Sequence, residues 1–295
     1  MNSIDLLTKI YKPYKVIVKG NIKIFNCTSG NYVIKKKNDK NIKDLYNYLS
    51  SRNFNYYPKL IEDNRSEVNV FEYIEDVSID KEQKLYDLIN LVGLLHNKTT
   101  FYKEITKDKI KTIYENLLGR VAFLEENINY IIYQNEDNVF MSPSANLLLN
   151  NSNKIFEALT FLKNEIEEWY KLSENDTKIR VSLVHNNIEL DHYIKNENEY
   201  LISWDNYIID TPIIDIVKLY KKIYLTMDFS EPLKIYLDNV ILNDKEKKLL
   251  FIMLVLPDEL LLTKNNEIKN VYLVRCYLDY IFKTENLIKN YYSNT

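Results

Sequence analysis

The sequence predicts an α+β protein with a small strand-rich N-terminal lobe and a larger, mainly helical C-terminal lobe. The first 75 residues contain five short segments rich in Val, Ile, Tyr and Phe, a composition that favours β-strands. From residue 77 onward, apolar residues recur at helical spacing in successive long segments. A polar hairpin over residues 180–205 interrupts the helical part. We therefore expect an N-lobe over residues 1–76 and a C-lobe over residues 77–295.

Five strands and one helix are expected in the N-lobe. The helix lies in KNIKDLYNYLSSR, where four apolar residues share one helical face, namely Ile42, Leu45, Tyr46 and Leu49. The first three strand segments are joined by short turns at Gly20 and Gly30, which predicts an antiparallel meander. The five strand segments are YKVIVKG, NIKIFNC, NYVIKKK, YPKLIEDN and EVNVFEYIE.

The C-lobe is expected to consist of packed helices. Ser142 and Pro143 suit the N-cap and the first position of one of them. The longest apolar run, LLFIMLVL, ends before Pro257 and is too short to cross a bilayer, so it predicts a buried helix. The other helical segments include EQKLYDLINLVGLLHNKT, DKIKTIYENLLGRVAFLEEN, NKIFEALTFLKNEIEEWYKL, DIVKLYKKIYL and NEIKNVYLVRCYLDYIF.

Composition narrows the class of partner. With 46% hydrophobic and 27% charged residues, the chain has the balance of a globular protein rather than a disordered one. A net charge of −3 gives no general attraction to nucleic acid or to an anionic membrane, so neither partner is expected. Cys27 and Cys276 lack a metal-type spacing and indicate free thiols in a reducing cytoplasm. The abundance of Asn, Lys, Ile and Tyr is typical of AT-rich bacterial codon usage.

The candidate catalytic and ligand-binding residues lie in six short motifs that follow one another along the chain. In order, the motifs are NYVIKK, VFEYIED, LVGLLHNKT, VHNNIELDH, ISWD and DTPIIDIVKL. Together they resemble the aminoglycoside phosphotransferase and choline kinase superfamily, and most closely its bacterial spore-coat kinase-like branch. The resemblance covers nearly the whole chain. It implies a bilobal protein-kinase-like fold, which agrees with the α+β pattern.

The resemblance also implies a nucleotide site in the N-lobe and a catalytic loop in the hairpin. Lys35 would hold the α- and β-phosphates of ATP, and backbone groups near Glu72 and Ile74 would face the adenine. In the loop, His185 would shape the backbone, with Asp215 buried beneath it as a support. These last two roles are structural, and they would survive a loss of catalysis.

Three positions of the catalytic motifs carry unexpected side chains. Asn187 stands where the family has the aspartate that orients the acceptor hydroxyl, and an amide cannot accept a proton at neutral pH. His192 replaces the loop asparagine, and imidazole suits softer metals better than Mg²⁺. Ser203 replaces the first acidic residue of the metal motif and is a poor anchor for Mg²⁺. The three changes together predict a degenerate catalytic loop.

A rescue through Asp205 stays open. If LISWD is extended, Ser203 and Asp205 point to the same side, because side chains alternate along a strand. Asp205 would then approach a metal from roughly 6–7 Å beyond the usual anchor. Glu189 and Asp191 would add carboxylates. ATP with Mg²⁺ or Mn²⁺ is therefore the cofactor to test, and none is assigned.

Two further parts of the nucleotide site lack residues that such a site usually has. The turn VKGNIK contains only Gly20, where a cover over phosphates usually has several glycines. The helix after Lys35 offers only Asp44 where a glutamate partner for the lysine is expected.

Three functions remain open on the sequence. The first is a pseudokinase or catalytically impaired kinase-like protein that acts as a binding or assembly component with a protein partner, in a spore-coat role. The second is an active ATP-dependent small-molecule phosphotransferase with an atypical metal site at Asp205. The third is a nucleotide sensor that binds ATP through Lys35 without turnover.

Overall fold

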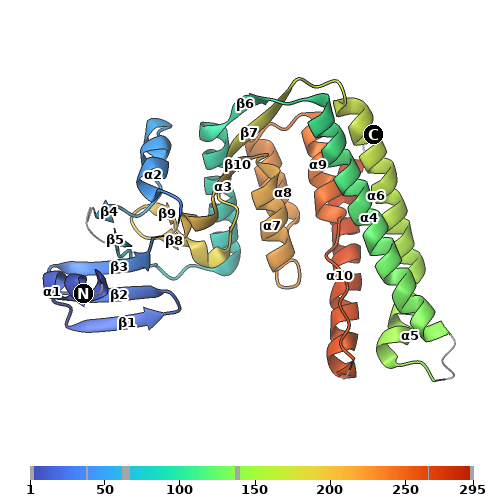
Figure 1. Ribbon diagram of the computed structural model, residues 1–295, viewed down its shortest axis with the longest axis horizontal. Helices are drawn as coiled ribbons and strands as arrows, with labels where there is room; N and C mark the ends of the chain where they lie inside the picture. The colour runs from blue at the N-terminus through green and yellow to red at the C-terminus, as the bar shows by residue number, and fades with distance from the viewer. Residues whose placement is uncertain (1–2, 38, 62–66, 137–139, 265, 293–295) are drawn as a thin grey trace. The chain divides into compact units, whose positions relative to one another are not determined.

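The chain forms two compact units (Figure 1). They are seen in a computed structural model that describes residues 3–37, 39–61, 67–136, 140–264 and 266–292. The first unit comprises Met1–Thr100 and Leu183–Ile209, and the second comprises Phe101–Ser182 and Asp210–Thr295. The division passes through two strands, and the lobe boundary expected at residue 76 stays a prediction.

The first unit is built on a five-stranded antiparallel sheet in the order β1-β2-β3-β5-β4. This confirms the expected strand-rich N-terminal part, although β4 is shorter than expected, and the predicted segment continues beyond the described residues. The sheet strands are β1 Lys15–Lys19, β2 Ile22–Cys27, β3 Gly30–Lys36, β4 Leu60–Ile61 and β5 Val68–Glu72. The helices are α1 Ser3–Tyr11, α2 Ile42–Ser51 and α3 Lys81–Thr99. The polar hairpin adds η1 Leu190–His192, β8 Tyr193–Lys195 and β9 Glu199–Leu201, followed by η2 Trp204–Asn206. Strand β10 Ile208–Asp210 belongs to a separate three-stranded sheet, in the order β10-β7-β6.

The two faces of this sheet have different neighbours because strand side chains alternate. One face carries a buried apolar cluster that includes Phe25, Cys27 and Ile34. Leu7 of α1 is fully buried in the same cluster, so α1 covers this face. Burial raises the pKa of the Cys27 thiol. Helix α1 was not among the elements predicted from the sequence, and it contributes Leu7 directly to the core.

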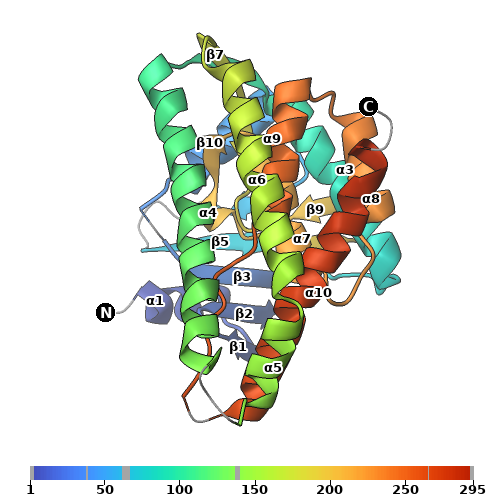
Figure 2. The ribbon, with the colours of Figure 1, turned by 90° about the vertical axis from the view of Figure 1, so that its right-hand side faces the viewer.

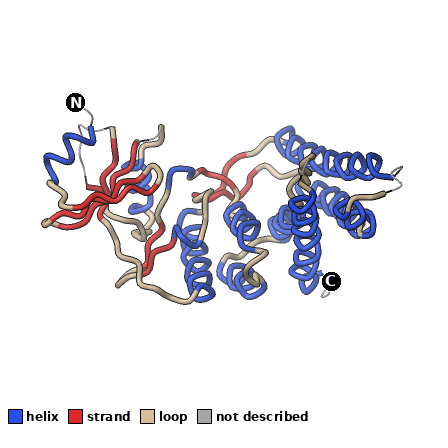
Figure 3. The backbone as a smooth tube through the Cα atoms, turned by 90° about the horizontal axis from the view of Figure 1, so that it is seen from below, coloured by secondary structure: helices blue, strands red, loops and turns tan. Residues whose placement is uncertain are grey.

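The second unit is nearly all helical (Figures 2 and 3). The long helices α4 and α6 lie side by side, and α9 packs against both α6 and α7. A short strand, β6, pairs antiparallel with β7, with Phe101 opposite Val181. The elements are β6 Phe101–Glu104, α4 Lys107–Glu136, α5 Pro143–Asn150, α6 Ser152–Ser173, β7 Lys178–Val184, α7 Ile213–Ile223, α8 Ser230–Asn239, α9 Asp244–Val255 and α10 Glu267–Tyr292.

Local signals account for two of these helices. Ser142 Oγ accepts a hydrogen bond from the Ala145 N–H at 3.3 Å, and Pro143 opens α5, as the sequence predicts. Asn243 and Glu246 form a reciprocal capping box at the start of α9. The apolar run in α9 is largely buried, which confirms the expected core helix. Within the described ranges, every helix is too short or too polar to cross a membrane.

Truncation of Leu7 should destabilise the first unit even though α1 is a short helix formed by residues 3–11. Leu7→Ala deletes a fully buried side chain and is expected to lower the free energy of unfolding by about 2–5 kcal/mol. Urea denaturation in a Trp169→Phe background checks this, because Trp204 then reports on the first unit. Ile10→Ala is the control, since Ile10 lies on the same helix with 57% exposure and should change stability by less than about 0.5 kcal/mol. Equal effects of the two substitutions would contradict the packing of α1.

Candidate nucleotide pocket

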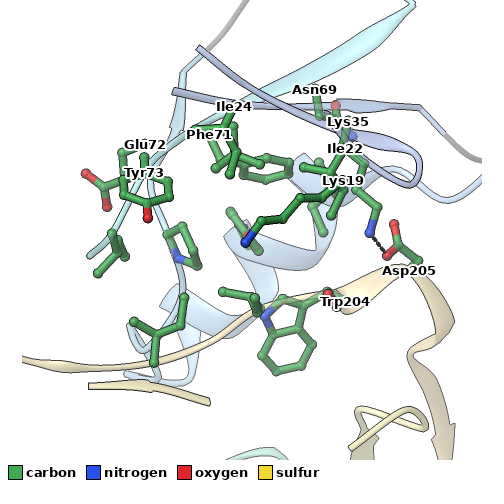
Figure 4. Close-up of a pocket in the computed structure, with 18 of the residues that line it drawn as sticks. Lys19, Ile22, Ile24, Lys35, Asn69, Phe71, Glu72, Tyr73, Trp204 and Asp205 are labelled. Atoms are coloured by element: carbon green, nitrogen blue, oxygen red, sulfur yellow. Dashed lines mark hydrogen bonds and ion pairs between the residues drawn. The ribbon is translucent and has the colours of Figure 1, made fainter. Parts of the chain in front are cut away.

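A cavity of about 200 Å³ lies within the first unit, on the face of the sheet opposite to α1 (Figure 4). Strands β1, β2, β3 and β5 form one wall, and α2 contributes Ile42 and Tyr46. The segment that follows β5 supplies Tyr73 and Ile74. The hairpin region forms the remaining wall from Ile194 and from residues 202–205.

The register of the sheet sorts the pocket-facing side chains into two rows. Ile22 lies opposite Lys19 on one side and Lys35 on the other, and Lys35 lies opposite Asn69. In the next pocket-facing row, Ile24 lies opposite Val33, which lies opposite Phe71. Directly opposed residues project from the same face of a sheet. The wall therefore has a row with two lysines and an amide beside a row that is wholly apolar.

The hairpin is attached to the first unit by hydrogen bonds at both of its strands. The Val77 N–H donates to the Lys195 carbonyl at 2.7 Å, and the Lys195 N–H donates to Asp76 Oδ1 at 2.9 Å. From the other strand, the Leu201 N–H donates to the Tyr56 carbonyl at 2.8 Å. These bonds fix the segment after Leu201 against the pocket.

Lys35 and Asp205 form an ion pair at the polar row (Figure 4). Both side chains are partly exposed, at 24% for Lys35 and 36% for Asp205. Asp44, the partner suggested by the sequence of α2, is instead exposed and accepts a hydrogen bond from Asn41 Nδ2 at 2.8 Å. The pocket-facing lysine of β3 is thus neutralised by the hairpin segment and not by α2.

The backbone that presents Asp205 is not extended, which corrects the premise of the expected alternation. Ser203 adopts a left-handed conformation, with φ 66° and ψ 46°, and Trp204–Asn206 form a 3₁₀ turn. The Trp204 Nε1–H donates to the Leu201 carbonyl at 2.8 Å, and its buried ring lies 4.8 Å from that of His185. Ser203 and Asp205 both line the pocket, but through a turn that the Trp204 side chain anchors.

The catalytic-loop residues form a compact hydrogen-bonded set. His185 is fully buried, and its Nε2–H donates to the Ile202 carbonyl at 2.8 Å. His192 Nδ1–H donates to the Asn187 carbonyl at 2.6 Å, so this interaction orients the imidazole. Asp191 is exposed beside it. The expected loop positions are therefore adjacent, and both histidine side chains donate to backbone carbonyls.

Asp215 belongs to the second unit. It lies fully buried in the first turn of α7. Burial raises the pKa of Tyr236 well above its usual value, and the charge of Asp215 adds a smaller increase. Its role as a support for His185 stays a prediction.

The side chains present fit a nucleotide better than a divalent metal ion. Of the residues that the structure describes, Asp205 and Glu72 are the two carboxylates that line the pocket. Glu72 accepts a hydrogen bond from the Lys59 N–H at 2.7 Å, and Figure 4 shows its carboxylate pointing away from Lys35. Among the described residues, no three His, Cys, Asp or Glu side chains are grouped to hold a metal ion. The polar row thus offers one carboxylate, Asp205, and it is already paired.

The structure brings together all three residues expected at the nucleotide site. Lys35, Glu72 and Ile74 line the same pocket. Lys19 and Lys40 also line the pocket, and neither was predicted from the sequence. Lys19 could have been found by following the alternation of β1, since it precedes the turn at Gly20. Lys40 carries no such periodic signal.

Tyr46 is a further pocket residue that the sequence placed only in the core. Its ring stacks on that of Tyr57, with centroids 4.0 Å apart. Burial, then the neighbouring Tyr57, Asp205 and Glu72, raises the pKa of the Tyr46 phenol. Tyr46 therefore stays neutral and presents an aromatic surface to the cavity.

Comparisons with known proteins identify the fold. No protein-family model matches the sequence, and no curated protein matches it. An aminoglycoside phosphotransferase from Alicyclobacillus acidocaldarius superposes with a TM-score of 0.68 at 8% identity, over 94% of this chain and 92% of its own. A spectinomycin phosphotransferase in an AMP-bound complex gives 0.54 at 12% identity, over 97% and 93%. The choline kinase LicA from Streptococcus pneumoniae gives 0.49 at 13% identity, over 98% of both chains.

Loss of the Asp76 carboxylate should loosen the hairpin. Asp76 Oδ1 accepts the Lys195 N–H and Oδ2 accepts from Lys84 Nζ at 2.7 Å. In Asp76→Ala we expect faster amide exchange across residues 193–201 by hydrogen–deuterium exchange mass spectrometry, with α2 unchanged. Asp76→Asn, which keeps an acceptor, should exchange more slowly than Asp76→Ala. Unchanged exchange in both variants would contradict this attachment.

With sequence identities of 8% and 12%, the superpositions on the two aminoglycoside-type phosphotransferases establish the fold alone. The antiparallel sheet of the first unit and the helices of the second correspond to the expected α+β architecture. The chain therefore has the protein-kinase-like fold of the aminoglycoside phosphotransferases to which it is structurally similar.

Proposed function

We propose that the first unit binds an adenine nucleotide in this pocket and that phosphoryl transfer is strongly impaired. The observation that carries the proposal is the ion pair between Lys35 and Asp205 at the polar row. The pair occupies the one carboxylate near the polar row, whereas Lys19 of that row and the neighbouring apolar row remain open to a ligand.

The two rows of the sheet suit the two halves of a nucleotide. Ile24, Val33 and Phe71 offer a flat apolar surface to a base, as ligand pockets commonly do. Lys35, one row away, is placed to meet phosphate oxygens. The similarly folded spectinomycin phosphotransferase has been solved with AMP and with ADP, which supports a nucleotide as the ligand class.

The same geometry disfavours transfer. Phosphoryl transfer depends on positioned metal ions and on a residue that orients the nucleophile. Asn187 cannot accept the proton of an acceptor hydroxyl, and Ser203 brings no charge to a metal. His192 donates its Nδ1 proton to a backbone carbonyl, so it shapes the loop.

A binding role without turnover fits a pseudokinase that acts as a sensor or as a component of a protein assembly. The sequence resemblance to the spore-coat branch would place that assembly in a bacterial spore coat, with the protein made in the cytoplasm. A protein partner would then recognise the nucleotide-bound first unit.

The alternative function is an active small-molecule phosphotransferase with an atypical metal site. Asp205 favours it, because this carboxylate lies in the pocket beside Lys35. Catalysis would require Asp205 to leave Lys35 and bind Mg²⁺ or Mn²⁺, with Lys35 transferred to the phosphates.

Nucleotide binding measured with and without metal separates the two functions. Under the proposal, calorimetry shows ATP binding in EDTA, and Asp205→Ala binds ATP equally or more tightly because Lys35 is freed. ATP at one hundred times its dissociation constant should stabilise the protein by about 2.7 kcal/mol. Lys35→Met should weaken binding, whereas Lys36→Met, an exposed neighbour on β3, should not.

The opposite result would support the alternative. Binding that requires Mg²⁺ or Mn²⁺ and disappears in Asp205→Ala, together with turnover of ATP by the wild-type protein, would overturn the proposed function. Absence of nucleotide binding under every condition would overturn both functions.

A further inference from the structure

We propose that Lys19 is a phosphate-binding residue that supplies the positive charge usually provided by a metal ion in this fold. This inference rests on the proposed nucleotide site and names the part of it that selects the ligand. The ligand class is an adenine nucleotide with two or more phosphates, bound in its metal-free form.

The sheet register places Lys19 beside Lys35. Lys19 is the last residue of β1 and lies opposite Ile22, which in turn lies opposite Lys35 on β3. Neighbouring strands are about 4.8 Å apart, so the two lysine backbones are separated by roughly 10 Å. Two long side chains from the same face can therefore reach one polyphosphate between them.

The Lys19 side chain is directed into the pocket. Its ammonium group lies among the lining residues in Figure 4, above Trp204 and away from the Lys35–Asp205 pair. No carboxylate of the described residues lies within ion-pair distance of the Lys19 Nζ. Lys35, in contrast, already has Asp205 as its partner. Lys40, the other lysine lining the pocket, donates its Nζ to the Tyr207 carbonyl, so Lys19 is the pocket lysine whose charge is available to an anion.

The turn after β1 explains why a side chain would take this role. Gly20 has φ 56°, and a Cβ there would meet nothing within 4 Å, so the turn is open to solvent above the sheet. A single glycine provides little backbone that could fold over phosphates and donate N–H groups. An ammonium group with three donors on a flexible stem can reach the same oxygens.

With a lysine in this position, we also expect the pocket to discriminate between the metal-free nucleotide and its Mg²⁺ complex. A divalent ion would occupy the β- and γ-phosphate oxygens that Lys19 contacts, and Asp205 is held by Lys35. The metal-free nucleotide should therefore bind at least as tightly as its Mg²⁺ complex, and affinity should increase from AMP to ADP and ATP.

The test compares Lys19→Met with Lys15→Met by calorimetry in EDTA, using adenosine, AMP, ADP and ATP. Lys15 is exposed on the same strand and the same face, and it does not line the pocket. Hydrogen bonds to charged groups contribute about 1.5–3 kcal/mol, so Lys19→Met should weaken ADP and ATP binding about ten- to hundredfold. Adenosine binding should change less than about threefold, Lys19→Arg should restore most of the ATP affinity, and Lys15→Met should match the wild-type protein.

The possible results distinguish this inference from the proposed function. Wild-type and Lys19→Met proteins that bind ATP equally would overturn the role of Lys19 and leave the nucleotide site intact. An equal loss of adenosine and ATP affinity in Lys19→Met would also overturn it, because it would indicate a change in pocket structure. Failure of both the wild-type protein and Lys15→Met to bind any of the four ligands would overturn the inference and the proposed function together.

Discussion

The pocket depends on the hydrogen bonds that hold the β8–β9 hairpin to the rest of the first unit. Backbone groups of Val77 and Tyr56 bind one hairpin strand each, and the Asp76 carboxylate adds a third contact. Backbone bonds of this kind are insensitive to side-chain identity. They hold the hairpin against the pocket whichever side chains it carries.

The second constraint is the register of the sheet. Because side chains alternate, a slip of one residue between β2 and β3 would exchange the pocket rows with the core that α1 covers. Phe25 and Ile34 are buried on the α1 side, and that burial fixes Ile24, Val33 and Lys35 on the pocket side. The same packing energy that stabilises the fold therefore also positions the ligand-facing residues.

Sequence reasoning located the elements well because their signals are local. The strand composition, the helical stripes and the cap at Ser142 each depend on a few neighbouring residues, and the structure has these elements. The set of Lys35, Glu72 and Ile74 came from the resemblance, and the three line one pocket.

What could not be predicted depends on contacts between distant segments. The pairing of Lys35 with Asp205 joins residues 170 positions apart, and it displaced Asp44 as the expected partner. The left-handed turn at Ser203 is likewise stabilised by tertiary contacts of Trp204, and nothing in the letters LISWD indicates it. Helix α1 is a short N-terminal segment, and its place in the core depends on contacts of Leu7 with the distant strands β2, β3 and β5.

The conformation of Ser203 bears on which side chains its position tolerates. A left-handed backbone costs most L-residues about 1–2 kcal/mol, whereas Asn and Asp adopt it more readily because their short polar side chains bond locally. Residue 203 therefore has a backbone conformation that aspartate tolerates. A single Ser203→Asp substitution could thus add a carboxylate to the pocket without rebuilding the turn.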